Sequence, residues 1–251
     1  MNQEEEFNTH MKTQNTFNPA LFDSLRKAEQ RHCWFVVRRS WILDRVKKML
    51  PALQSAFLEI GCGTGNVSSF LAAHGYAVTG CEYFSDALLM SWPGFRKVQG
   101  SATALPFKDN HFDAVGLFDI LEHFDDDIQV LAEAARVVKK DGLIFVTVPA
   151  RRDLWSSFDD YSRHKRRYHP EDLKSLFDKA GLTNLSIEYL FLSLYIPAKI
   201  TRRKPLQDPF RIGVIANFVF RNLFETERHL SRTLPMPLGT SLLGVAKKLL
   251  P

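Results

Sequence analysis

Three glycines and one acid have the spacing that most directly suggests chemistry. Gly61, Gly63 and Gly65 follow an apolar run, so they allow a tight turn and let a ligand approach the backbone. Glu82 follows about 20 residues later, where an acid can hydrogen-bond the hydroxyls of a ribose. The pattern is not the GxGxxG of a dinucleotide site, because Asn66 stands where the third glycine would be. A nucleoside-containing ligand is indicated, although a tight turn without a ligand and a solvated surface acid also fit.

A second group of titratable side chains lies in two later segments. His123 is a candidate general base, or alternatively a residue that braces its loop. Asp159 and His164 are candidates for a base and the group that orients it, and Arg166 and Arg167 for a clamp on an anionic acceptor. A salt-bridged loop that packs against the N-terminal helix fits the same residues. We expect no metal site.

The periodicity of apolar residues predicts the elements that must hold these side chains. Helices are expected over residues 21–50, from 66 to 75, and over 85–90, 128–138 and 170–180. Strands are expected over residues 57–60, 77–81, 97–99, 112–118, 143–148 and 241–246. This alternation favours a parallel sheet with both faces covered, which binds ligands beyond the carboxyl ends of its strands. Residues 1–20 are expected to form a flexible lead, 21–251 a single domain, and 191–238 an insertion or lid.

Short motifs then give a family resemblance. They read EIGCGTG at 59–65, CEY at 81–83, GSATALPF at 100–107, FDAV at 112–115 and DILEH at 119–123. Together they resemble the class I S-adenosylmethionine-dependent methyltransferase family, closely over residues 57–148. The resemblance implies S-adenosylmethionine as cofactor and S-adenosylhomocysteine as product.

The resemblance also implies an order of contacts along the sheet edge. The glycine turn would hold the amino-acid part of the cofactor, and the acid after the second strand would hold the ribose. The next loop would contact the adenine, and the loop after the fourth strand would lie near the methionine. The implied cofactor-binding residues are Glu59, Gly61, Gly63, Gly65, Glu82, Tyr83, Ser101, Ala102 and Asp119.

One position departs from the family pattern. The adenine loop usually carries an acid where Ser101 stands, and a hydroxyl accepts the adenine amino group more weakly than a carboxylate. The backbone N–H of Ala102 remains available. We therefore expect weaker cofactor binding, not a different cofactor.

The implied fold is α/β, a Rossmann-like, doubly wound, seven-stranded and mostly parallel sheet with helices on both faces. An N-terminal helical cover and a helical insertion before an antiparallel last strand complete it. HCWFVVRR at 32–39, WSxxD at 155–159 and HxRRY at 164–168 resemble a sub-group of bacterial-type small-molecule methyltransferases. In that sub-group a helix covers the cofactor, so Arg38 or Arg39 is a candidate partner for the cofactor carboxylate. Two exposed arginines are the alternative.

Composition sets the broad class. The chain has 251 residues, 45% of them hydrophobic and 24% charged, which suits one globular domain. Its three cysteines include no CxxC pair, and we see no signal peptide and no long apolar run, so a cytoplasmic protein without a disulfide framework is expected. The net charge of +5 permits nucleic acid, acidic substrates or anionic lipid without selecting among them.

The expected function is in-line methyl transfer to a small-molecule or lipid-linked acceptor. Aromatic and basic residues in 191–238 allow peripheral membrane contact, although a buried lid or a dimer face fits them too. A nucleic-acid or protein methyltransferase is disfavoured by the loop at 118–122, which lacks the proline-aromatic sequence of base methylases. A non-catalytic scaffold protein stays an alternative, and Asn66 argues against a dehydrogenase.

Overall fold

The computed structural model describes residues 17–203 and 210–249, built around a seven-stranded sheet in the order β3-β2-β1-β4-β5-β7-β6. β7 pairs antiparallel with β5 and β6, whereas the other neighbouring strands pair in parallel. This confirms the predicted Rossmann-like sheet and its antiparallel last strand. The strands are β1 (Ala56–Ile60), β2 (Ala77–Glu82), β3 (Arg96–Gln99), β4 (Phe112–Phe118), β5 (Val138–Pro149), β6 (Leu182–Leu190) and β7 (Ser241–Lys248).

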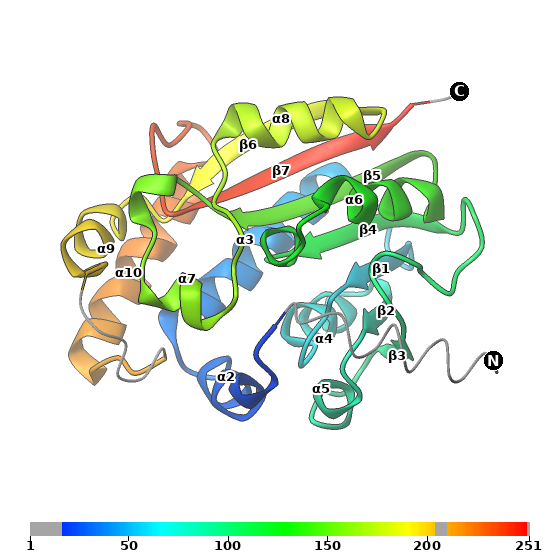
Figure 1. Ribbon diagram of the computed structural model, residues 1–251. Helices are drawn as coiled ribbons and strands as arrows, with labels where there is room; N and C mark the ends of the chain where they lie inside the picture. Colours follow the sequence, from blue (N-terminus) through cyan, green and yellow to red (C-terminus); the bar gives the residue numbers. More distant parts are fainter. Residues whose placement is uncertain (1–16, 204–209, 250–251) are drawn as a thin grey trace.

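Helices cover both faces of the sheet, as Figure 1 shows. α6 (Asp127–Val137) and α8 (Pro170–Lys179) pack on one face, and α3 (Cys33–Met49) and α4 (Asn66–Ala73) on the other. α10 (Val214–Leu230) packs against α3. The remaining helices lie near the ends to which the parallel strands point; they are α2 (Phe22–Ala28), α5 (Ser85–Leu89), α7 (Ser157–Tyr161) and α9 (Tyr195–Thr201).

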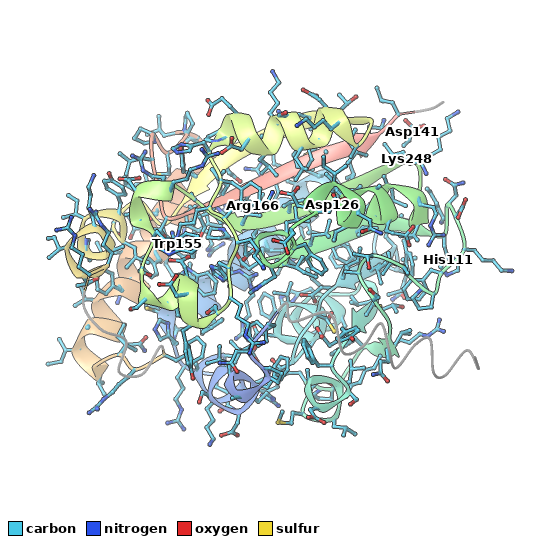
Figure 2. All side chains as sticks on the ribbon, in the orientation of Figure 1. His111, Asp126, Asp141, Trp155, Arg166 and Lys248 are labelled. Carbon is cyan, nitrogen blue, oxygen red and sulfur yellow. The ribbon has the colours of Figure 1, made fainter. Side chains whose placement is uncertain are left out.

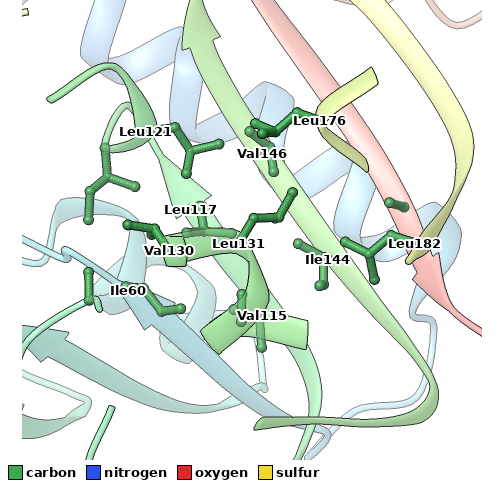
Figure 3. Close-up of a cluster of buried hydrophobic side chains, with 14 of the residues drawn as sticks. Ile60, Val115, Leu117, Leu121, Val130, Leu131, Ile144, Val146, Leu176 and Leu182 are labelled. Carbon is green, nitrogen blue, oxygen red and sulfur yellow. The ribbon is translucent and has the colours of Figure 1, made fainter. Parts of the chain in front are cut away.

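The central strands are apolar because they are buried on both faces. Figure 3 shows Val115 of β4 and Ile144 of β5 close to Leu131 of α6, with Leu176 of α8 beside Val146 of β5. Val115, Ile144 and Leu131 are fully buried, and each such side chain contributes about 1.5–3 kcal/mol relative to an exposed one. This core fixes the strand ends that carry the candidate site.

The N-terminal helical prediction needs one correction. A single helix was expected over residues 21–50, but the chain forms a 3-10 turn at Pro19–Leu21, then α2, and then α3 after a break. His32 ends the break, since its Nδ1 accepts a hydrogen bond from the Trp34 amide at 3.2 Å as the N-cap of α3. The break lets α2 lean over the sheet edge instead of continuing α3.

The structure also adds detail at residues 1–20 and 191–238, the expected flexible lead and the expected insertion or lid. Residues 1–16 lie outside the described residues, but Phe17 packs against Phe22 and belongs to the folded cover. The sequence pattern missed the edge strand β6, whose burial does not alternate cleanly, and it did not place α7, α9 or α10. The helix expected over residues 85–90 is α5, which begins at Ser85 with Phe84 as its N-cap. Among the described residues, every helix is too short or too polar to cross a bilayer.

Candidate active site

The glycine turn between β1 and α4 is bent by three left-handed residues. Gly61, Gly63 and Gly65 have φ of +67°, +52° and +75°. A Cβ on Gly61 would lie 2.1 Å from Ile120 Cδ1, and one on Gly65 would lie 2.3 Å from the Phe95 ring. A Cβ on Gly63 would meet nothing within 4 Å. Gly61 and Gly65 therefore serve close packing, whereas Gly63 faces open space that a ligand can fill.

Glu82, at the end of β2, lies beside this turn. Its carboxylate accepts hydrogen bonds from the amides of Gly63 at 2.8 Å and Phe84 at 3.0 Å. Burial raises the pKa of Glu82 despite these bonds. A carboxylate has about four acceptor sites, so capacity remains for two ribose hydroxyls. The next residue, Tyr83, also lines the site.

A cavity of about 450 Å³ opens between this sheet edge and the N-terminal cover. Nine of the twelve predicted site residues line it, and three do not. The lining residues are Glu59, Gly61, Gly63, Glu82, Tyr83, Ala102, Asp119, His123 and His164. Gly65, Ser101 and Asp159 stand behind the wall.

Ser101 does not line the cavity, and its hydroxyl is bonded within its own turn. Its Oγ lies 2.9 Å from Thr103 Oγ1 and accepts from the Thr103 amide at 3.3 Å. The side chain thus shapes its own turn, while Ala102 lines the cavity. The adenine contact of the Ser101 hydroxyl stays a prediction, and the backbone of Ala102, which lines the cavity, is the second candidate.

The sheet holds two acids near the glycine turn, one buried and one half-buried. Glu59, on β1, accepts a short hydrogen bond from Ser68 Oγ, and burial raises its pKa to about 7. Asp119 follows β4 with φ of +56°, a strained value for a residue other than glycine and one that clusters at functional sites. Its carboxylate pairs with Arg38 and accepts from Thr147 Oγ1 at 3.1 Å.

The two candidate arginines of α3 have different surroundings. Arg38 is 7% exposed and lines the cavity, with its guanidinium paired to Asp119. Arg39 does not line the cavity, and its guanidinium lies over the Phe70 ring, 4.7 Å from the centroid. The hypothesis of a contact with the cofactor carboxylate therefore rests on Arg38.

Asp159 and His164 lie together as a hydrogen-bonded pair, and the geometry distinguishes the group that orients from the group that is oriented. Asp159 is fully buried and lies 2.9 Å from His164 Nδ1 and 2.8 Å from Arg167 Nε. Burial alone would raise the pKa of Asp159, but its bonds to His164 and Arg167 outweigh burial and hold that pKa at about 2. The carboxylate can only accept, so Nδ1 of His164 is the donor in this bond, and in a neutral ring Nε2 would then keep its lone pair. Asp159 orients, and His164 presents the lone pair.

Glu122 and His123, on the 3-10 turn Leu121–His123, meet His164 in the cavity wall. The rings of His123 and His164 lie edge to face, with centroids 4.8 Å apart. The Lys165 amide donates to the Glu122 carbonyl at 2.6 Å, which fastens the two loops together. Burial raises the pKa of Glu122 well above its ordinary value, and the Asp119 carboxylate raises it further. Glu122 was not singled out in the sequence, because its neighbours along the chain give no sign of this burial.

The expected clamp by two arginines is wrong for Arg166. Its guanidinium donates to Asp127 Oδ2 at 3.0 Å and to the Asp125 carbonyl at 2.7 Å, and it does not line the cavity. In Figure 2, Arg166 is seen next to Asp126, the N-cap residue of α6 between these two partners. Arg167 lines the cavity, but it is engaged by Asp159 and the Ala150 carbonyl. The salt-bridged loop, the alternative left open by the sequence, describes these arginines better.

Glu29 joins the cover to the glycine turn, a role that no sequence signal indicated. It is 4% exposed and accepts from Thr64 Oγ1 at 2.6 Å and from Trp92 Nε1 at 2.8 Å. Leu194 and Ala198, at and within α9, close the other side of the cavity. The predicted N-terminal helical cover and the helical insertion before β7 are both present.

The residues present fit S-adenosylmethionine. Gly63 leaves open space beside Glu82, as a bound nucleoside requires. Among the described residues, buried polar atoms of Asn66, Tyr83 and Thr240 have no hydrogen-bond partner, and all three residues line the cavity. Unsatisfied buried groups are costly, so they indicate a site that a polar ligand completes.

The sheet order, the glycine turn and the acid after β2 define a methyltransferase fold, and the family comparison agrees. The chain belongs to the methyltransferase domain family, whose model matches residues 37–187. The cofactor of this family's S-adenosylmethionine-dependent members is the one that the cavity fits.

Individual relatives are distant. A protein named as a probable S-adenosylmethionine-dependent methyltransferase of Mycobacterium tuberculosis is 29% identical over 139 residues, which cover 53% of this chain and 51% of the relative. The chain thus spans about half the length of such curated relatives. A ubiquinone/menaquinone biosynthesis C-methyltransferase of Geotalea daltonii is 27% identical over 210 residues, 78% of this chain and 81% of the relative.

Solved structures confirm the fold alone. A SAM-dependent methyltransferase from Thermotoga maritima superposes with a TM-score of 0.59 at 20% identity, covering 91% of this chain and 98% of that one. Phosphoethanolamine N-methyltransferase 2 of Haemonchus contortus, in complex with S-adenosyl-L-methionine, gives a TM-score of 0.58 at 15% identity and covers 83% of this chain and 52% of that one.

Proposed function

We propose that this chain is an S-adenosylmethionine-dependent methyltransferase acting on a small, largely apolar acceptor. The open space at Gly63 beside the buried Glu82, within a methyltransferase-family fold, carries the proposal. When bound, S-adenosylmethionine supplies a methyl group already activated by its sulfonium. The protein's main task is then alignment, which can supply about 7–11 kcal/mol of the barrier.

Each side chain has a task in that alignment. Glu82 binds the ribose hydroxyls of the cofactor, and the glycine turn binds its amino-acid part. Arg38 binds the carboxylate of that amino-acid part. The N-terminal cover, fastened by Glu29, excludes water from the cavity. His164 points a lone pair into the cavity, oriented by Asp159, where it can receive the proton of an acceptor or hold a cation.

The acceptor class follows from the lining and from relatives. Beyond the strand ends the wall is aromatic and aliphatic, with Phe158 and Leu194 among its members. Relatives include the ubiquinone/menaquinone biosynthesis C-methyltransferase and a ubiquinone biosynthesis O-methyltransferase of Nitrosomonas europaea. A ring-bearing acceptor of the quinone-precursor kind, with a hydroxyl or acidic ring carbon, fits such a wall.

Calorimetric titration with S-adenosylhomocysteine tests the cofactor site. Glu82→Ala should lose most of the affinity, since two charge-assisted hydrogen bonds are removed. Glu171→Ala, at the exposed start of α8, is the matched control. If the wild type binds NAD instead, the chain is not a methyltransferase; if it binds neither, the scaffold alternative holds. Phenols, quinone precursors and glycolipids then form the acceptor screen.

We also propose that the C-terminal helices rest on an anionic membrane surface, from which a lipid-linked acceptor would enter. Val214, Ile215 and Phe218 of α10 are 87%, 82% and 68% exposed and share one helical face. Exposed Arg211 and Arg221 flank them. Apolar side chains bordered by arginines suit an interface of anionic lipid.

Sedimentation with phosphatidylserine vesicles at low ionic strength tests this proposal. An Ile215→Ser/Phe218→Ser double variant should pellet less than the wild type. Leu89→Ser is the control, because Leu89 is 84% exposed on α5, away from this helix face. Wild-type protein that stays in the supernatant would exclude membrane contact, leaving a dimer face or bare surface.

A further inference from the structure

We propose that Glu122, His123 and His164 bind one divalent transition-metal ion in the cavity wall, against the expectation of no metal site. Each residue offers one ligand atom, and these atoms all lie within 4.8 Å of one another. Two imidazoles and one carboxylate are a ligand set that zinc and similar ions accept while keeping a further position open. We take Zn²⁺ as the probe.

Glu122 gives the first independent sign of a missing cation. Its side chain is fully buried, and neither carboxylate oxygen has a hydrogen-bond partner among the described residues. A buried carboxylate without partners is very costly unless it is protonated or compensated by a cation. The positive charge of Arg38 acts on Glu122 from a distance, but its guanidinium is paired with Asp119. A metal ion would supply the positive charge that the surrounding side chains do not.

Asp159 gives the second sign, through His164. Metal-bound histidines usually donate their other ring N–H to a carboxylate, which fixes the tautomer and the ring orientation. Here His164 Nδ1 lies 2.9 Å from Asp159 Oδ1, and Arg167 holds that carboxylate from the other side. The lone pair at Nε2 is thereby directed to the cluster.

The backbone brings the ligands together before any metal arrives. Glu122 and His123 share one 3-10 turn, and the Lys165 amide bonded to the Glu122 carbonyl fixes the loop that carries His164. Ligand atoms around one zinc ion lie about 3.3 Å apart, as Zn–N and Zn–O bonds of about 2.0–2.1 Å require. The widest separation, up to 4.8 Å, would have to shrink by about 1.5 Å on metal binding.

The position of the site suggests its use. All three ligands line the same cavity as Asp119 and the glycine turn. A metal ion there would face the acceptor side, where it can bind an acceptor oxygen and lower the pKa of its hydroxyl. His164 would then act by holding the ion rather than by taking the proton. This role of the metal ion in binding the acceptor rests on the proposed function, but the metal-binding site itself does not.

The test is Zn²⁺ binding to the full chain after removal of metals with a chelator. A competition titration against a coloured chelator should show one equivalent bound by the wild type. Glu122→Gln and His164→Gln should each raise the Kd for Zn²⁺ at least about 10-fold. Asp159→Asn should raise it about 10–100-fold, because Asp159 orients the ligand His164 without binding the metal itself. His111→Gln, at an exposed histidine outside the cavity lining, is the control and should bind like the wild type.

Two results would overturn the proposal. One is less than one equivalent of Zn²⁺ bound by the wild type, and the other is equal binding by Glu122→Gln, His164→Gln and His111→Gln. Retained S-adenosylhomocysteine binding shows which variants are folded, and it reports on the methyltransferase proposal separately. Co²⁺ adds a second readout, because its visible absorption bands should appear in the wild type and disappear in whichever cluster variant folds.

Discussion

Substituting alanine at two glycines of the same turn should separate folding from cofactor binding. At Gly63, an alanine must adopt a φ of +52°, which costs about 1–2 kcal/mol, but its Cβ meets no protein atom within 4 Å. At Gly61, the same backbone cost is joined by a Cβ 2.1 Å from Ile120, and overpacking adds about 1–3 kcal/mol. The expected loss of unfolding free energy is thus about 1–2 kcal/mol for Gly63→Ala and about 2–5 kcal/mol for Gly61→Ala.

Cofactor affinity should depend most on Gly63, although Gly63→Ala costs less stability than Gly61→Ala. The new methyl group of Gly63→Ala occupies the space assigned to the cofactor, so we expect the Kd for S-adenosylhomocysteine to rise at least about 10-fold. Gly181→Ala is the matched control, because Gly181 has φ of +70°, no atom within 4 Å of an added Cβ, and a position at the end of α8.

Urea unfolding gives the stability of each variant, and calorimetry gives the Kd. The reasoning predicts that Gly63→Ala and Gly181→Ala lose similar stability, because they carry the same backbone cost, while only Gly63→Ala loses affinity. Equal Kd values for these two variants would show that the cofactor does not lie against the turn. A fully stable Gly61→Ala would show that Ile120 can move aside.

Three further predictions concern charged groups. Arg38→Ala should raise the Kd for S-adenosylhomocysteine about 10-fold or more, whereas Arg39→Ala should leave it unchanged; equal values by calorimetry would end the carboxylate-pairing hypothesis. Asp159→Asn should cost about 3–5 kcal/mol in urea unfolding, since it leaves Arg167 buried without its carboxylate, and a loss under 1 kcal/mol would contradict this. Because the folded pKa of Glu59 is about 7, the folded state keeps a proton that the unfolded state releases above about pH 4.5. Stability should therefore fall by about 3 kcal/mol between pH 4.5 and 7 and then level off, and Glu59→Gln should remove that part of the slope in urea curves measured across this range.

Short sequence patterns predicted the part of the molecule that is proposed to bind the cofactor. The apolar runs, the glycine turn and Glu82 lie within 30 residues of one another, and their spacing alone implies a strand, a turn and an acid at the next strand end. Strand–helix alternation then leaves few ways to build the sheet, because crossover connections are right-handed. For this reason the mostly parallel sheet with its antiparallel last strand agrees with expectation, and most of the predicted site residues line the cavity.

The failures lie where local signals are weak. Arg166 resembles an anion clamp, but Asp127, almost 40 residues earlier, takes its guanidinium. β6 is an edge strand of mixed burial, so it lacks the apolar pattern that marked the central strands.

What the sequence by itself determined is therefore the fold and the cofactor turn, since both follow from short-range patterns. Only the tertiary structure decided the acceptor side. Glu122 is an ordinary acid in the sequence, and its meaning comes from complete burial next to His164, which arrives from a loop about 40 residues later. Burial and pairing between distant segments depend on packing of the whole chain, and no local pattern records them.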